Sequence, residues 1–376
     1  MYRKPDYATA RNPKKFSWSA SGSYLSCLAL SGVPLRDFFL KPDACIEAYR
    51  VGREKQRQLF DPQDVSLPSP ATPPVSYGHA NGLGARLFFP EGGEVAVEHC
   101  FAHSLEEAME ALARPVDFAS AGMAPFYLDF REQMMRAFPG ESVGFSFGAE
   151  GPCTTAYELR GDAFFVDVME EPARTKEFLS RINDSILAFE QFRLGVSGGK
   201  VFNESGASLC DDIAAMIPPR LWNEFVLPFW SDLFCRRTTG DVHAHVEDLK
   251  PAHLPFLEQI GLSYYDPSIS HHLNPRIIAD KCRVPFGWRL GGIHLPVLDA
   301  QDVEDFVFQS AADGASRVFT ILEANSCSGE NIPKIDAFIR AAKEVKRLLD
   351  EGCPRRALAD HVSERGRHKF WDNWCS

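Results

Sequence analysis

The feature that most constrains the fold is an alternation of helical stretches with short apolar strands from Ser104 to residue 351. Most of the predicted helices are long enough to cross over between parallel strands, so the pattern is typical of a parallel sheet. No glycine fingerprint of the Rossmann or Walker type follows a predicted strand, which argues against a nucleotide-binding doubly wound fold. We predict an α/β protein, a single (β/α)8 TIM barrel with an N-terminal helical extension. The predicted helices are 104–114, 124–138, 171–193, 219–236, 247–260, 274–282, 301–312 and 332–351; the predicted strands are 142–147, 199–203, 241–245, 263–265, 286–290 and 318–322.

The predicted barrel has a short segment on either side. Residues 1–20 form a basic lead-in with little pattern, residues 21–352 form the barrel, and residues 353–376 form a C-terminal tail. The end of the tail, Phe370-Trp371-Asp372-Asn373-Trp374-Cys375, is rich in aromatic side chains, which suggests docking onto the body of the protein or a second subunit. A homodimer is therefore one expectation for the oligomeric state.

Charge and composition restrict the environment and the partners. The net charge of −11 argues against nucleic acid and anionic membranes as partners, because both repel an acidic surface. No apolar run approaches the roughly 20 residues of a membrane helix, and the basic N-terminus lacks the apolar centre of a signal peptide. The ten cysteines are scattered without a Cys-x-x-Cys pair, which fits reduced thiols. We expect a cytoplasmic protein.

The strongest chemical signal is the pair His243 and His245. If residues 241–245 form a strand, alternate side chains share a face, so both imidazoles point the same way. Such a pair could hold a metal ion, serve acid–base chemistry, or be two hydrogen-bonded structural histidines. Cys327 follows the strand-like residues 317–322 and could supply a third, softer ligand.

Polar residues stand after most of the predicted strands. In a (β/α)8 barrel the strand C-termini converge on the face that carries the active site. We therefore predict catalytic or ligand-orienting roles there for Glu150, Glu204 and Asp266, any of which could hold an imidazole through its second nitrogen. Weaker candidates at the same face are Asp212, His294 and Glu323.

Five further motifs stand out along the chain: GPCTTAYELRG (151–161), CDDIAAMIPPRLWNEFVLPFW (210–230), VHAHVEDLKPAHLPFLEQIGLSYYDPS (242–268), WRLGGIHLPVL (288–298) and ILEANSCSGENIPK (321–334). Together they resemble the uroporphyrinogen decarboxylase superfamily, in particular its branch of cobalamin-dependent methyltransferases. Members of this superfamily are single (β/α)8 barrels, so the resemblance implies the same fold. Its methyltransferases have a zinc site with a His-x-Cys pair on one strand and a distant Cys. The resemblance places His243 on the His, Cys327 on the distant Cys, and His245 where the first Cys is expected.

The decarboxylase branch is a poorer match. It holds the carboxylates of its substrate with an arginine-rich N-terminal motif, but the corresponding residues 17–24 contain no arginine. A polyanionic porphyrinogen needs several cations at its site, and arginine is the usual source of them.

The residues and the resemblance together predict a zinc-dependent methyltransferase. It would move a methyl group between a small molecule and a corrinoid (cobalamin) protein, with Zn2+ as a Lewis acid held by His243, His245 and Cys327. The small molecule could be a methyl ether, another methylated compound, or a thiol acceptor. The alternatives are a decarboxylase-like lyase acting on another substrate and a non-catalytic barrel that binds a ligand.

Overall fold

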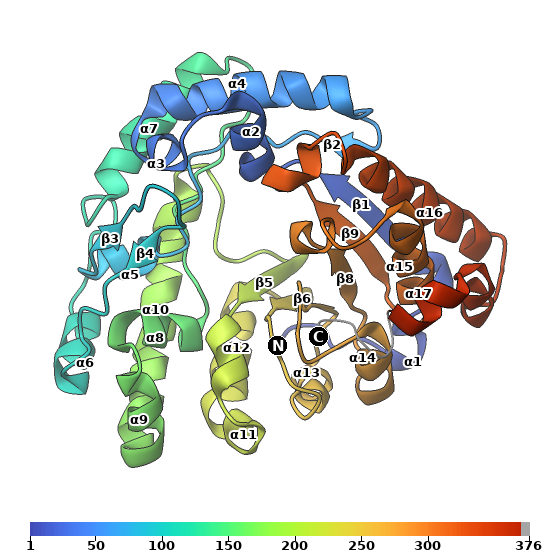
Figure 1. Ribbon diagram of the computed structural model, residues 1–376. Coiled ribbons are helices and arrows are strands. Elements are labelled where there is room, and N and C mark those ends of the chain that lie inside the picture. The colour runs from blue at the N-terminus through green and yellow to red at the C-terminus, as the bar shows by residue number, and fades with distance from the viewer. Residues whose placement is uncertain (370–376) are drawn as a thin grey trace. The chain divides into compact units, whose positions relative to one another are not determined.

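The computed structural model describes residues 1–369 of the 376 in the sequence (Figure 1). Contacts within the chain divide it into two compact units. The first unit comprises Met1–Arg3, Pro34–Ile46 and Ser69–Ala244, and the second comprises Lys4–Val33, Glu47–Pro68 and the chain from His245 onward. The aromatic residues from Phe370 to Cys375, which the sequence suggests as a docking segment, lie outside the described residues.

The second unit contains a parallel sheet that collects several strand ends at one edge. Its order is β2 (Val65–Ser66), β1 (Ser17–Ser21), β9 (Arg317–Ile321) and β8 (Gly287–Leu290), and each neighbouring pair is parallel. A parallel bridge between Tyr265 and Phe286 connects β7 (Tyr264–Asp266) to the chain just before β8. Because these strands run in one direction, the segments after β7, β8 and β9 emerge at the same edge.

Three helices of the second unit begin after residues whose side chains accept hydrogen bonds from their first N–H groups. Ser23 caps α2 and Asp299 caps α15 through reciprocal capping boxes, and the side chain of Asn274 caps α14. These elements are α1 (Tyr7–Ala10), η1 (Pro13–Lys15), α2 (Tyr24–Ser31), α13 (Leu254–Ile260), α14 (Pro275–Lys281), η4 (Gly292–His294), α15 (Ala300–Ala312), η5 (Ala324–Cys327), α16 (Ile332–Asp350), η6 (Arg355–His361) and α17 (Glu364–Lys369). Helix α4 (Pro42–Leu59) begins in the first unit and continues in the second.

The first unit is mostly helical around an aromatic core. Tyr127, Phe147 and Phe189 are fully buried, and the ring centroids of Tyr127 and Phe147 are 5.3 Å apart. Strand β5 (Gly206–Cys210) is hydrogen-bonded to β6 (Asp241–His245), whose last residue opens the second unit. The other elements are α3 (Leu35–Leu40), α5 (Gly78–Gly82), β3 (Leu87–Phe88), β4 (Ala96–Val97), α6 (Leu105–Ala113), α7 (Ala124–Ala137), α8 (Pro152–Arg160), α9 (Ala163–Glu170), α10 (Pro172–Gly195), η2 (Asp212–Met216), η3 (Pro219–Leu221), α11 (Trp222–Phe225) and α12 (Leu227–Arg237).

The structure confirms a mixed α/β protein with parallel strands, and the closed eight-stranded barrel stays a prediction. The strand predicted at residues 241–245 is found with those bounds. The strand predicted at residues 199–203 is wrong, because the strand lies at Gly206–Cys210. Strand β1 was not predicted: it falls in the lead-in, where Ser17, Ser19 and Ser21 gave no apolar signal. Among residues 1–369, no helix combines the length and apolar character needed to cross a membrane.

Candidate metal and acid site

Strand β6 presents its two histidines on one face, as predicted. Val242 and Ala244 are buried, whereas Asp241, His243 and His245 are half-buried, so burial alternates along the strand. Burial lowers the pKa of His243, and the carboxylate of Asp241 opposes this shift. His243 is therefore a neutral imidazole at neutral pH.

The imidazole of His245 is held from one side by an acid. Its Nδ1 atom lies 3.1 Å from Oδ2 of Asp266, the last residue of β7, and its Nε2 atom lies 3.7 Å from Oε1 of Glu247. The other carboxylate oxygen of Asp266 accepts a hydrogen bond of 2.8 Å from the backbone N–H of Ser268. Burial raises the pKa of Asp266, but the hydrogen bond and charge of His245, the N–H of Ser268 and the charge of Arg289 together outweigh it, so the net shift is downward. Asp266 is thus an ionised carboxylate that can fix the orientation of the ring.

Two residues at the end of the neighbouring strand belong with His245 to a group of metal-ligand type. The ligand atoms of Cys210, Asp212 and His245 all lie within 4.8 Å of one another, and each residue is half-buried. Cys210 ends β5 and His245 ends β6. A thiolate, a carboxylate and an imidazole form a donor set that zinc accepts in proteins.

The thiol of Cys210 lies among acids of the first unit. Glu150 forms a side-chain hydrogen bond with Cys210, and burial raises the pKa of Glu150. Burial also raises the pKa of Cys210, and the negative charges of Glu150, Asp212 and Asp211 raise it further. Such surroundings favour a bound cation.

A second acid, Glu158 on α8, lies deeper in the first unit. The residue is 2% exposed, and neither of its carboxylate oxygens has a hydrogen-bond partner among residues 1–369. Burial, together with the charges of Glu150 and Asp211, raises its pKa well above the usual range. Glu158 is therefore a neutral carboxylic acid at neutral pH. A buried, ionised carboxylate without donors would be very unfavourable.

The turn after β5 is fixed by Asp211. This buried carboxylate accepts hydrogen bonds from the backbone N–H groups of Cys153 and Thr154, at 3.3 and 2.7 Å, and from Nε1 of Trp230, at 2.6 Å. Burial raises its pKa to about 6 in spite of these donors. A Cβ atom at Gly151 would lie 2.5 Å from Cβ of Asp211, so only glycine allows this approach. Asp211 thereby holds its neighbours Cys210 and Asp212 in place.

Cys327, predicted as the distant zinc ligand, is half-buried in η5 of the second unit, and burial raises the pKa of its thiol to about 11. The nearby Glu323 pairs with Arg289 at 2.5 Å. Neither Cys327 nor His243 belongs to the group formed by Cys210, Asp212 and His245. Their role as ligands stays a prediction.

The other two predicted acids lie in different settings. Glu150 lies beside the metal-ligand group through its contact with Cys210. Glu204 is exposed and precedes β5, because that strand starts later in the chain than predicted.

The sequence reasoning did not single out Cys210, Asp211 or Glu158. The position of Cys210-Asp211-Asp212 directly after a strand would have been the signal for the first two.

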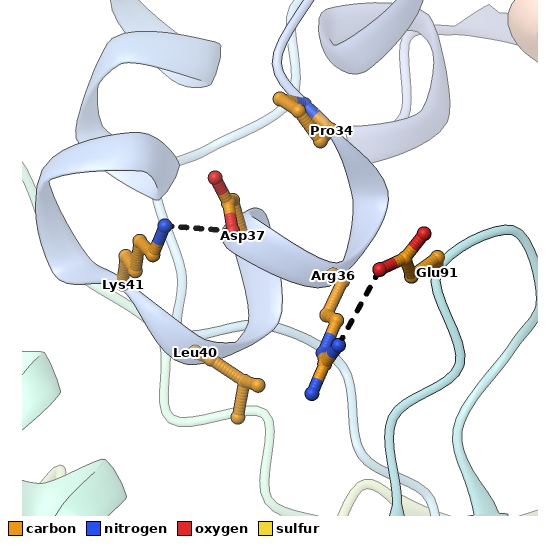
Figure 2. A pocket seen from close by; sticks show the side chains of 6 residues that line it. All are labelled: Pro34, Arg36, Asp37, Leu40, Lys41 and Glu91. Carbon is orange, nitrogen blue, oxygen red and sulfur yellow. Dashed lines mark ion pairs between the residues drawn. The ribbon is translucent and has the colours of Figure 1, made fainter.

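A separate pocket of about 560 Å³ lies in the first unit around α3 (Figure 2). It is lined by charged side chains that are already paired: Lys41 with Asp37 at 2.9 Å, and Arg36 with Glu91 at 3.6 Å. No predicted site residue lines it. We assign it no function.

Among solved structures, a methyltransferase from Methanosarcina mazei has a similar fold. The alignment has a TM-score of 0.63 and 13% sequence identity, and it covers 92% of this chain and 99% of that chain. At this identity the likeness shows the fold. No protein-family model matches the chain, and no curated protein matches it.

Proposed function

We propose that the chain is a zinc-dependent methyltransferase that moves a methyl group between a small molecule and a corrinoid protein. The observation that carries the proposal is His245, which contacts Asp266 through one nitrogen and belongs to a Cys–Asp–His group of ligand atoms. The fold shared with a methyltransferase supports methyl transfer as the reaction class. We also propose that the fold is a closed (β/α)8 barrel and that the chain is related to the corrinoid-dependent branch of the uroporphyrinogen decarboxylase superfamily.

In this proposal Cys210, Asp212 and His245 hold the metal ion, and the resemblance adds His243 and Cys327 as competing ligands. Asp266 would fix the ring of His245 through Nδ1, so that Nε2 would be the nitrogen that holds the metal. A bound zinc ion supplies Lewis acidity, which lowers the pKa of a thiol or polarises an ether oxygen. Asp211 accepts hydrogen bonds from three N–H groups and thereby holds Cys210 and Asp212 in position.

Glu150 is the proposed proton donor when the methyl donor is an ether. The bond between the methyl carbon and the ether oxygen would break, and the methyl group would pass to the reduced corrinoid of the partner protein. The oxygen would keep the electron pair of the broken bond and take up a proton. Glu150 retains its proton to higher pH than an exposed glutamate, because it is largely buried, and it contacts Cys210 at the metal group. With a thiol as the acceptor no such proton donor is required.

The experiment measures methyl transfer with free cobalamins as probes. Zinc-loaded protein is mixed with methylcobalamin and a small thiol, and separately with reduced cobalamin and an aromatic methyl ether. We expect the absorption of the corrinoid to change in one of these mixtures and not with metal-free protein. The absence of any metal-dependent change in both mixtures would refute the proposal. Release of carbon dioxide from a carboxylated substrate without metal would favour the lyase alternative.

A further inference from the structure

Two strongly exposed apolar side chains lie in one short segment of the second unit. Ile293 is 60% exposed and Val297 is 70% exposed, and both lie in the segment that follows β8. Between them, His294 is buried, and its Nδ1 atom accepts a hydrogen bond of 3.1 Å from the N–H of Gly291. The segment is thus fixed by its histidine, while the two apolar side chains face solvent. We call Ile293 and Val297 the β8 patch.

The last described residue of the chain lies beside this patch. The Nζ atom of Lys369, at the end of α17, donates a hydrogen bond of 3.4 Å to the carbonyl of Val297 and pairs with Asp302 at 2.7 Å. Arg365, one turn earlier, pairs with Asp299 at 2.9 Å. Figure 1 shows α17 beside α15. These ion pairs hold the end of α17 against the segment that carries the β8 patch.

The chain continues from Lys369 with Phe-Trp-Asp-Asn-Trp-Cys-Ser, residues 370–376. Lys369 contacts Val297, and seven residues reach at most roughly 25 Å when fully extended, so the β8 patch is within the reach of this segment. Three aromatic residues in seven provide a large apolar area. We propose that residues 370–376 bind the β8 patch, with Phe370, Trp371 or Trp374 covering Ile293 and Val297.

The proposed contact does not depend on the proposed methyl transfer.

The native Cys375 allows a direct test by disulfide trapping. Val297→Cys in the full chain is oxidised with oxidised glutathione at low protein concentration, and the linkages are mapped by mass spectrometry. We expect a bond between positions 297 and 375 within one chain, which is lost when Cys375→Ser is added. The matched control is Val166→Cys, on α9 of the first unit, where the native side chain is 52% exposed. We expect no comparable bond to Cys375 there.

Three results would overturn the proposal. These are equal trapping at positions 166 and 297, no trapping at 297, and a bond that forms only between two chains, which would make a second copy the occupant of the patch. A second measurement uses a protein that ends at Lys369. We expect amide hydrogen exchange of residues 291–298 to increase several-fold on truncation, while residues 163–170 of α9 stay unchanged. Unchanged exchange at 291–298 would also contradict the proposal.

Discussion

The Nδ1 atom of His245 lies 3.1 Å from Oδ2 of Asp266, at the ends of two different strands. This contact joins a residue that the sequence suggested as a ligand to one that it suggested as an orienting acid. It gives Nδ1 of His245 an acidic partner that can hold the ring in one orientation. The chemistry proposed for the site depends on this orientation.

Asp266→Asn should weaken metal binding without removing a ligand. The amide cannot supply the negative charge that favours N–H donation from Nδ1, so the ring loses its fixed orientation. We expect zinc affinity to fall about 10- to 100-fold, measured by competition with a chelator of known affinity. Asp336→Asn, at an exposed position on α16, is the control and should bind zinc like the wild type. Equal affinity in Asp266→Asn would show that the contact does not support a ligand.

Glu158→Gln should stabilise the protein at neutral and alkaline pH. The pKa of Glu158 is raised in the folded state, mainly by burial. Its contribution to stability is therefore fully present below the unfolded pKa of about 4.3, and it is lost as pH rises through the folded pKa. Below pH 4 the two proteins should melt at similar temperatures, and the advantage of the variant should grow with pH by at most about 1.4 kcal/mol per unit.

Thermal melts from pH 4 to 9 measure this difference. Glu170→Gln, an exposed residue at the end of α9, is the control and should melt like the wild type throughout. A Glu158→Gln protein whose melting temperature stays parallel to that of the wild type across this range would contradict a neutral buried acid.

His294 should make the protein sensitive to acid. Burial lowers its pKa to about 4, with Arg289 and His271 adding to the effect. The unfolded imidazole takes up its proton near pH 6.5, so stability should fall as the pH drops from about 6.5 to about 4. His294→Asn should lower the number of protons taken up on unfolding by one, and so flatten the pH dependence of stability, as measured by urea unfolding at several pH values. The exposed His272→Asn should leave the slope unchanged, and an unchanged slope in His294→Asn would contradict the account.

Gly151→Ala should disturb the turn that carries Cys210 and Asp212. The added Cβ would lie 2.5 Å from Cβ of Asp211 and 2.9 Å from the carbonyl of Cys210. We expect a loss of about 1–3 kcal/mol in the free energy of unfolding, as for overpacking elsewhere, together with weaker zinc binding. Gly195→Ala, where a Cβ meets nothing within 4 Å, is the control for both measurements.

Periodic apolar patterns allowed much of the fold to be predicted from the sequence. Helices α6, α7, α10, α14, α15 and α16 and strand β6 lie where the patterns place them. The patterns failed at the serine-rich strand Ser17–Ser21 and at residues 199–203, where Val201 and Phe202 resemble part of a strand. Strand pairing, rather than local preference, determines these segments.

Part of the candidate site could also be predicted from the sequence. Alternation along a strand predicts that His243 and His245 share a face, and the structure confirms it. The proximity of Cys210 and Asp212 to His245 could not be predicted, because it depends on the correct start of β5. The burial of Glu158 could not be predicted either, because a glutamate within a helix is usually exposed to solvent.

The most direct test of the account is the zinc content of protein purified without chelator, compared for the wild type, His245→Ala, Cys210→Ser and Cys327→Ser. We predict about one zinc per chain in the wild type, near-complete loss in His245→Ala, and a strong loss in Cys210→Ser. Retained zinc in Cys327→Ser would favour the Cys210–Asp212–His245 group as the binding site. A wild-type protein that binds no zinc, or a His245→Ala protein that keeps it, would contradict the central claim.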